Sequence, residues 1–277
     1  MSNEMDVLSS DGRQPSDDED ELPLPLPTPT STPLQHPDCC LGLSTTLVDT
    51  ILHIFQAHTD TRPVANPREL TKPRLKCLSI GSGTGLFEAL LTSRVTDHHT
   101  FELDLRGVEV ASSTAANKYL PHRQRCAVQS TSSVYEEASD FDVWLFVYPR
   151  DPRLVWKYLD CALKHAENPE LLLFLGPKSD FLPSVDTQDE SHQETFADVL
   201  GSVSDHLDEC QKFTAQNEEA GLQRLHLRSR CSPDSCKSKS SLLHASILSS
   251  PAVGFTSYEI LCVLCRCHGQ RDNTSGQ

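Results

Sequence analysis

The chain has 277 residues and a net charge of −15, and 37% of its residues are hydrophobic. This length suffices for one large domain or two small ones, while the acidic balance and the lack of a lysine and arginine cluster argue against direct nucleic-acid binding. No stretch has the roughly 20 consecutive apolar residues of a membrane helix, so we expect no membrane association either.

The first 38 residues are acidic and rich in proline, and we expect them to form a disordered tail. They hold nine acidic residues and one arginine, a net charge of −8 that leaves −7 for the rest of the chain. Such a composition offers too little apolar surface to offset the entropy of ordering. The tail also lacks the basic and apolar regions of a signal peptide, so we expect a cytoplasmic or nuclear protein.

A helix is expected over Leu43–His58, where Leu47, Ile51 and Phe55 recur at helical spacing. Ser44 or Thr45 can serve as its N-cap. Residues 62–73 contain three prolines and are expected to link this helix to the next domain. The sequence therefore divides into a tail (1–38), a helix and linker (39–72) and a main domain (73–277).

The stretch from Lys76 to Leu91 combines a short apolar strand, a glycine-rich turn and the start of an apolar helix. This order brings backbone N–H groups and a helix N-terminus up to a ligand. Glycine suits the turn because it allows positive φ angles and close approach of the backbone. The sequence therefore predicts a nucleotide-type binding loop made of Gly81, Ser82, Gly83, Thr84 and Gly85.

Several kinds of glycine loop have to be weighed against this pattern. The dinucleotide fingerprint has its last glycine at the sixth position, where this chain has Leu86. A phosphate-binding P-loop ends in Gly-Lys-Ser/Thr, and no lysine follows here. A turn that only joins a strand to a helix is the alternative without a ligand.

The next strand is expected over Phe101–Val110, with Glu109 at its carboxyl end and 24 residues beyond Gly85. In nucleotide-binding βαβ units, an acidic side chain at this point accepts hydrogen bonds from ribose hydroxyls. A surface glutamate solvated by water is the alternative. Loop and acid together favour a ligand site over a plain turn.

The GxGxG loop and Glu109 resemble class I S-adenosylmethionine-dependent methyltransferases, over about residues 73–269. The resemblance implies S-adenosyl-L-methionine as the cofactor, with the loop around its methionine part and Glu109 on its ribose. It also implies that the segment after the third strand lies near the adenine, a segment made of Gln129, Ser130 and Thr131. Two positions depart from the family pattern, because Ser79 and residues 128–131 stand where many members carry acidic residues.

Further strands and helices alternate along the main domain, which predicts a parallel sheet covered by helices on both faces. With the resemblance, the expected fold is α/β: a doubly wound, mostly parallel, seven-stranded sheet with an antiparallel last strand. Residues 229–255 are rich in serine, cysteine and lysine and are expected to be a surface insertion. The expected elements are helices at Ala111–Leu120, Leu154–His165 and His192–Cys210 and strands at Arg125–Gln129, Phe141–Arg150, Leu171–Leu175, Gly221–Arg228 and Tyr258–Cys267.

In open parallel sheets a ligand binds beyond the carboxyl ends of the strands, where the strand order reverses. The end of the fourth strand is therefore where a transferred methyl group should meet its acceptor. Tyr148 and Arg150 are the catalytic candidates there, because a tyrosine can hydrogen-bond or pack on an acceptor and an arginine can hold an anionic one. The alternative for Tyr148 is a residue at the lip of the site with its hydroxyl in water.

The chain has eleven cysteines, which we expect to be free thiols. Cys262 and Cys265 have zinc-like spacing, but they fall in an apolar strand pattern, so no metal is expected. No set of residues typical of nucleophilic catalysis can be assembled by spacing, and methyl transfer can proceed by alignment of acceptor and methyl alone.

The sequence thus favours a methyltransferase acting on a protein side chain or a small metabolite. A non-catalytic binding or scaffold protein with the same fold is the second hypothesis, supported by the two departures from the family pattern. An NAD(P)-dependent oxidoreductase is a weaker third, because Leu86 replaces the last glycine of its fingerprint.

Overall fold

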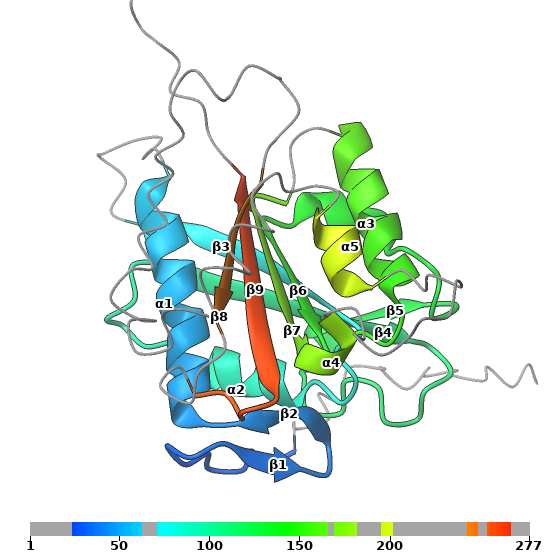
Figure 1. Ribbon diagram of the computed structural model, residues 1–277. Coiled ribbons are helices and arrows are strands. Elements are labelled where there is room, and N and C mark those ends of the chain that lie inside the picture. Colours follow the sequence, from blue (N-terminus) through cyan, green and yellow to red (C-terminus); the bar gives the residue numbers. More distant parts are fainter. Residues whose placement is uncertain are drawn as a thin grey trace, which may run out of the picture.

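A mixed seven-stranded sheet forms the centre of the molecule (Figure 1). The computed structural model describes residues 24–62, 71–165, 169–181, 195–201, 243–248 and 254–266. The strand order is β5-β4-β3-β6-β7-β9-β8. The strands are β3 (Arg74–Ile80), β4 (Glu102–Val110), β5 (Arg125–Val128), β6 (Val143–Val147), β7 (Leu171–Pro177), β8 (Leu243–Leu248) and β9 (Glu259–Arg266).

Five of these strands, from β5 to β7, pair in parallel, whereas β9 runs antiparallel to both β7 and β8. The expected doubly wound, mostly parallel sheet with an antiparallel last strand is therefore confirmed. The sixth strand differs in position, because β8 lies within the stretch that was expected to be an insertion. The expected strand at Gly221–Arg228 and most of the helix at His192–Cys210 lie outside the described residues.

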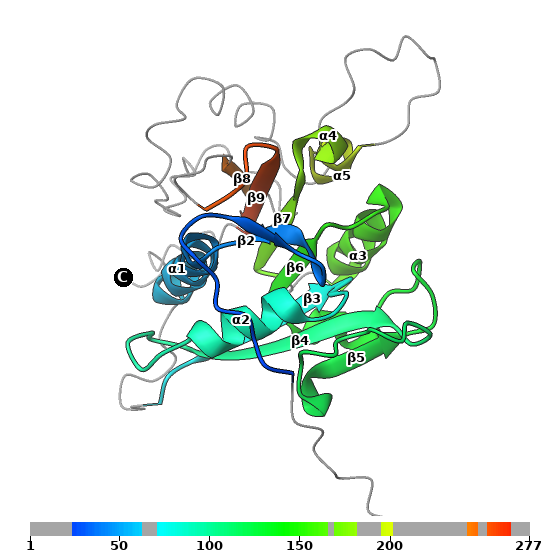
Figure 2. The ribbon, with the colours of Figure 1, turned by 90° about the horizontal axis from the view of Figure 1, so that it is seen from below.

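Helices cover both faces of the sheet (Figure 2). On one face lie α1 (Thr45–Thr61) and α2 (Leu86–Arg94), and on the other lie α3 (Pro152–His165) and α5 (Phe196–Gly201). Strand β7 shows why both faces are apolar: Leu171, Leu173 and Leu175 belong to the first core, whereas Leu172 and Phe174 belong to the second. Alternate residues of a strand point to opposite faces, so a continuous apolar run fits a sheet buried on both sides. The remaining helical turns are α4 (Lys178–Phe181) and the 3-10 helices His122–Gln124 and Glu136–Asp140.

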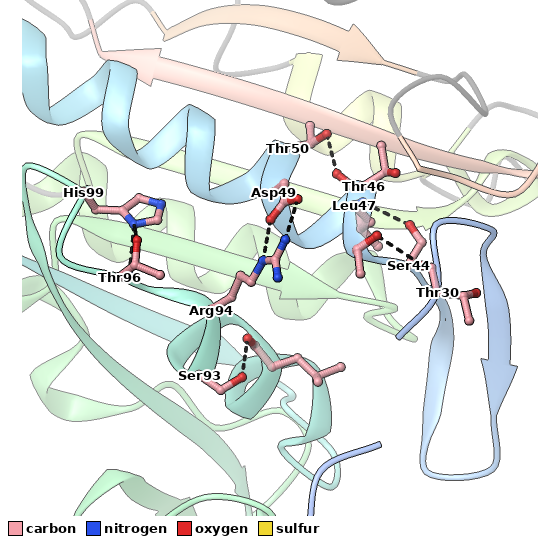
Figure 3. A network of polar contacts seen from close by, with 12 residues as sticks. Thr30, Ser44, Thr46, Leu47, Asp49, Thr50, Ser93, Arg94, Thr96 and His99 are labelled. Atoms are coloured by element: carbon pink, nitrogen blue, oxygen red, sulfur yellow. Dashed lines mark hydrogen bonds and ion pairs between the residues drawn. The ribbon is translucent and has the colours of Figure 1, made fainter. Parts of the chain in front are cut away.

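Helix α1 begins at the N-cap Ser44, one of the two caps that the sequence suggested. The Ser44 hydroxyl accepts a hydrogen bond of 3.0 Å from the Leu47 N–H (Figure 3), which satisfies one of the free donors of the first turn. Arg94 at the end of α2 donates to both carboxylate oxygens of Asp49 on α1, at 2.8 and 3.1 Å. This fork links the two helices on the face of the sheet that they cover.

A hairpin of β1 (Leu34–His36) and β2 (Cys39–Leu43) lies at the carboxyl end of the parallel strands. Part of this hairpin falls in the tail that was expected to be disordered, and for residues 24–38 that expectation is wrong; residues 1–23 lie outside the described part. Leu41 and Leu43 are buried in the core and Leu26 packs against it. The hairpin is ordered because β2 supplies the apolar anchors that the proline-rich segment lacks.

The segment after β4 also differs from the expectation, because residues 111–120 form a series of turns and not a helix. The N–H of Asn117 donates to the Gly83 carbonyl (2.8 Å) and that of Tyr119 to the Thr84 carbonyl (3.1 Å). Asn117 has a φ of +52°, which a helix does not allow. Hydrogen bonds to the glycine loop thus replace those of a helix. Separately, no described helix is long and apolar enough to cross a membrane.

Candidate functional site

A cavity of about 510 Å³ opens at the carboxyl ends of β3, β4 and β6. Ligand pockets in proteins typically measure about 300–1,000 Å³, so a nucleoside-sized molecule fits. Strand β3 pairs with β4 on one side and β6 on the other, which makes this the point where the strand order reverses. Its walls come from the glycine loop (81–84), the end of β4, the turn at 148–151 and the hairpin residues 37–40.

The glycine loop connects β3 to α2, and its three glycines all adopt positive φ angles, between +58° and +76°. Most of its N–H groups already have partners inside the protein. Gly81 and Ser82 both donate to the Val108 carbonyl, at 2.9 and 3.1 Å, and Gly85 donates to the Ser82 carbonyl at 3.0 Å. A loop that satisfies its own donors does not present the cradle of free N–H groups that a phosphate requires.

The fourth of these donors, the Gly83 N–H, bonds to Glu109 at 2.8 Å. The other carboxylate oxygen of Glu109 accepts from the Val110 N–H, also at 2.8 Å. The side chain is half-buried at the cavity wall, and each carboxylate oxygen keeps lone pairs for a second donor. The backbone thus fixes the position of the Glu109 carboxylate, which keeps the capacity to accept further hydrogen bonds at the cavity wall.

The Asn117 side chain holds the glycine loop in place through hydrogen bonds, a role that the sequence did not reveal. Its side-chain N–H donates to the Gly107 carbonyl (2.9 Å), and its carbonyl oxygen accepts from the Ser82 hydroxyl (2.6 Å). Asparagine is one of the few residue types enriched at positive φ, but no pattern in the sequence marks this one. Close packing explains Gly85, which faces Leu120 and does not line the cavity: an added Cβ would lie 2.8 Å from Leu120 Cγ.

Glu88, in the first turn of α2, is a further cavity residue that the sequence analysis missed. Its side chain is 1% exposed, and one oxygen accepts a hydrogen bond from the Ser79 hydroxyl at 2.5 Å. Among the described residues the other oxygen, Oε2, has no hydrogen-bond partner. Burial raises the pKa of Glu88 to about 7, against the opposing effect of the Ser79 hydrogen bond. The only signal in the sequence was a single acid among Leu86, Phe87, Leu90 and Leu91.

The hairpin is fastened to the loop at Asp38. The Thr84 hydroxyl donates to the Asp38 carbonyl (2.6 Å), while the Asp38 carboxylate accepts from Lys118 (2.6 Å) and from the Tyr119 hydroxyl (2.7 Å). The hydrogen bonds from Lys118 and Tyr119 lower the pKa of Asp38. Residues 37–40 therefore form one wall of the cavity, so the N-terminal segment is part of the site.

At the carboxyl end of β6, Tyr148 and Arg150 both line the cavity, but only one of them has a side-chain partner among the described residues. The Tyr148 hydroxyl donates to the buried Glu259 at 2.6 Å, and burial together with this bond raises the pKa of Tyr148. The hydroxyl is therefore bonded within the protein and is not left in water, as the alternative for Tyr148 had it. Arg150 is exposed. Its side chain makes no hydrogen bond or ion pair with the residues that the structure describes.

Of the residues expected near an adenine, Ser130 and Thr131 line the cavity, whereas Gln129 is exposed and lies outside its wall. The cavity thus brings together Gly81, Ser82, Gly83, Thr84, Glu109, Ser130, Thr131, Tyr148 and Arg150. Within the described ranges, no group of three or more histidine, cysteine or acidic side chains is arranged to hold a metal ion.

Neither a protein-family model nor a curated protein matches the chain. Among solved structures, the methyltransferase domain of bacterial Hen1 is similar at 13% identity with a TM-score of 0.41, over 79% of this chain and 97% of that one. The O-methyltransferase TomG from Streptomyces achromogenes, in complex with S-adenosylmethionine, is similar at 14% identity with a TM-score of 0.38, over 81% of this chain and 82% of that one. Magnesium protoporphyrin IX methyltransferase from Synechocystis, with bound S-adenosylmethionine, is similar at 12% identity with a TM-score of 0.36, over 79% of this chain and 78% of that one. Similarity of this degree carries no functional assignment, which has to come from the cavity.

Proposed function

We propose that the chain is an S-adenosylmethionine-dependent methyltransferase. The observation that carries this proposal is a glycine loop most of whose N–H groups bond within the protein, placed beside an acid at the end of the next strand. A dinucleotide would need free donors for its pyrophosphate, whereas S-adenosylmethionine has no phosphate and still has a ribose for Glu109. The same contrast counts against the oxidoreductase.

The cavity walls suggest how the cofactor would lie. Residues 81–84 would contact its methionine part, Glu109 would accept hydrogen bonds from the ribose hydroxyls, and Ser130 and Thr131 would lie beside the adenine. Gln129, which the resemblance also implied, is the weakest of these assignments because its side chain faces solvent. When bound, the cofactor supplies an electrophilic methyl group.

The turn at 148–151 would then hold the acceptor. Tyr148 would serve as an apolar wall and not as a proton carrier, because its hydroxyl is already committed to Glu259. Arg150 would attract an anionic group of the acceptor from the cavity rim. Holding acceptor and methyl in line is a sufficient contribution of the protein when the acceptor needs no deprotonation. The acceptor would be a protein side chain or a small metabolite.

A non-catalytic binding protein is the second candidate, and one observation favours it. The turn at 148–151 presents a tyrosine whose hydroxyl is occupied and an arginine, whose side chain has donors and no acceptor. Neither group can accept a proton from an acceptor as it stands. An acceptor that must be deprotonated would therefore not react here without an additional base.

The two candidates separate in a transfer assay. The full chain is incubated with methyl-labelled S-adenosylmethionine and a cell extract, which is then split into protein and small-molecule fractions. A methyltransferase transfers label to one fraction and releases S-adenosylhomocysteine, and Glu109→Ala abolishes both. Binding of the cofactor without label in either fraction would instead establish the non-catalytic protein.

A further inference from the structure

The carboxylate of Glu88 is buried at the cavity wall with one oxygen unpaired. Glu88 is 1% exposed and lines the cavity. Ser79 Oγ donates to its Oε1, and its Oε2 has no hydrogen-bond partner within the described part of the chain. A buried polar atom left without a partner costs stability, so this oxygen calls for an explanation beyond packing.

A helix-capping role does not supply that explanation. Glu88 is the third residue of α2, where a glutamate commonly reaches back to the N–H of the N-cap residue. Here the N-cap is Gly85, and its N–H donates to the Ser82 carbonyl at 3.0 Å instead. The neighbours Leu86, Phe87, Leu90 and Leu91 are all buried and apolar, so an apolar residue would fit the position as well. Neither helix capping nor packing therefore accounts for the unpaired oxygen of Glu88.

We propose that Glu88 binds the cationic amino group at the amino-acid end of the ligand. This inference rests on the proposed function, because only an amino-acid-bearing nucleoside places an ammonium group there. An ammonium group has three N–H donors and no acceptor, which matches an unpaired carboxylate oxygen. Position agrees as well, because Glu88 lies one helical turn beyond the glycine loop that would hold the methionine part.

A pH dependence follows from the charged and titratable groups that surround Glu88. Glu109 faces it from β4, Cys39 from β2 and Cys77 from β3, and none of these is cationic. Near pH 7 the empty site therefore holds Glu88 in both its neutral and its ionised form. A bound ammonium group favours the ionised form, so binding releases protons and strengthens as the pH rises through 7.

Two ligands and three proteins test the proposal by calorimetric titration at pH 7. The ligands are S-adenosylhomocysteine and its analogue in which hydrogen replaces the amino group. The proteins are the full wild-type chain, Glu88→Gln, and the control Glu102→Gln, whose side chain is exposed at the start of β4. Glutamine keeps the size of the side chain and can still accept from Ser79, so Glu88→Gln is expected to fold.

The expected result is an effect of Glu88 on the amino ligand alone. Glu88→Gln should weaken S-adenosylhomocysteine roughly 10- to 100-fold, the range for a charge-assisted hydrogen bond, and leave the deaminated analogue unchanged. Equal affinities of Glu88→Gln and wild type for S-adenosylhomocysteine, or equal losses for both ligands, would overturn the assignment. If wild type binds neither ligand, the proposed function itself fails and this inference with it.

Proton release gives a readout that needs no variant, in case Glu88→Gln does not fold. Titrations in buffers of different ionisation enthalpy should show that wild type releases protons with S-adenosylhomocysteine, and markedly fewer with the deaminated analogue. Equal proton release with the two ligands would contradict a role of Glu88 at the amino group.

Discussion

Two buried glutamates show how differently the same residue type is used in this molecule. Glu259 is fully buried and accepts four hydrogen bonds, from the Gly42 and Thr256 N–H groups and from the Thr256 and Tyr148 hydroxyls, at 2.6–3.2 Å. Glu88 is equally buried and accepts one from a side chain. A carboxylate whose two oxygens both accept hydrogen bonds stabilises the fold around it. Glu259 thus connects β9 to the hairpin and to the turn at 148–151. Glu88, at the cavity wall, keeps one oxygen unpaired within the described residues, and we propose a ligand ammonium group as its partner.

The Tyr148 hydroxyl should therefore matter for stability. Tyr148→Phe leaves Glu259 with one donor fewer in a buried site, which should lower the free energy of unfolding by about 1.5–3 kcal/mol. Urea unfolding measures the change. The control is Tyr258→Phe, whose exposed side chain should change stability by no more than about 0.5 kcal/mol. Equal effects of the two substitutions would refute the buried role of Tyr148.

Alanine substitutions of Gly81 and Gly85 should lower the free energy of unfolding by different amounts, because the surroundings of the two glycines differ. Gly81 and Gly85 have nearly the same φ, +74° and +76°, but a Cβ at Gly81 meets no atom within 4 Å whereas one at Gly85 overlaps Leu120. Gly81→Ala should cost about 1–2 kcal/mol for the left-handed backbone alone. Gly85→Ala should cost about 1–3 kcal/mol more, because a packed core resists added atoms. Thermal and urea unfolding of the pair decide this, and a Gly81→Ala variant as unstable as Gly85→Ala would show that the loop packs differently.

At the scale of elements, the sequence identified the helices and strands in which the spacing of apolar residues agrees with the positions of the residues that end the element. The strand, glycine turn and helix around residues 74–94 have buried runs of the right period, and the structure contains them. Residues 111–120 were expected to be a helix, yet the Gly83 and Thr84 carbonyls accept hydrogen bonds from the N–H groups of Asn117 and Tyr119, and the segment forms turns. Contacts between segments distant in sequence decided that case. The same holds for β1 and β2, whose order depends on pairing and on anchors in the core.

The hydrogen bonds of Asp38 should hold the hairpin against the cavity, and a bound ligand should stabilise the hairpin further. Removing its charge with Asp38→Asn weakens the bonds from Lys118 and Tyr119, so amide hydrogen exchange over residues 37–43 should speed up. Added S-adenosylhomocysteine should slow exchange over the same residues in the wild type. Exchange in this segment that responds neither to the substitution nor to the ligand would remove the hairpin from the site.

At the opposite end of the sheet, an ionic cluster joins α1 to the strands. Glu170 before β7 lies 2.7 Å from Arg62 and 3.3 Å from His58. Although burial alone would raise the pKa of Glu170, its contacts with His58 and Arg62 prevail and lower it to about 2. The folded-state pKa thus lies below that of the unfolded chain, so the stabilisation is complete above about pH 5 and is lost as the pH falls toward 2.

The substitution Glu170→Gln tests this cluster. It should reduce the free energy of unfolding at pH 7 by about 1.5–3 kcal/mol, and the difference from wild type should shrink as the pH falls from 4.5 to 3. Urea unfolding at pH 7, 4.5 and 3 gives the comparison. A difference that stays constant over this range would mean that Glu170 stabilises the fold through packing and not through its charge.

For the molecule as a whole, the strand order determines where the cavity lies. The order reverses at β3, the cavity opens there, and the wall residues come from five separate stretches of the chain. The sequence located the loop and Glu109 because both lie at a fixed place after an apolar strand. It did not locate Glu88, Asn117 or the hairpin wall, because burial, positive φ and contacts across the fold decide their roles.

The central claim is that this cavity takes a nucleoside with an amino-acid end and no phosphate. Calorimetric titration of the full chain with S-adenosylmethionine and, separately, with NAD tests it most directly, with Glu109→Ala and the exposed control Glu102→Ala alongside. We expect micromolar binding of S-adenosylmethionine that Glu109→Ala weakens roughly 10- to 100-fold and Glu102→Ala leaves unchanged, and no binding of NAD. Binding of NAD in preference, or of neither molecule to the folded protein, would contradict the account.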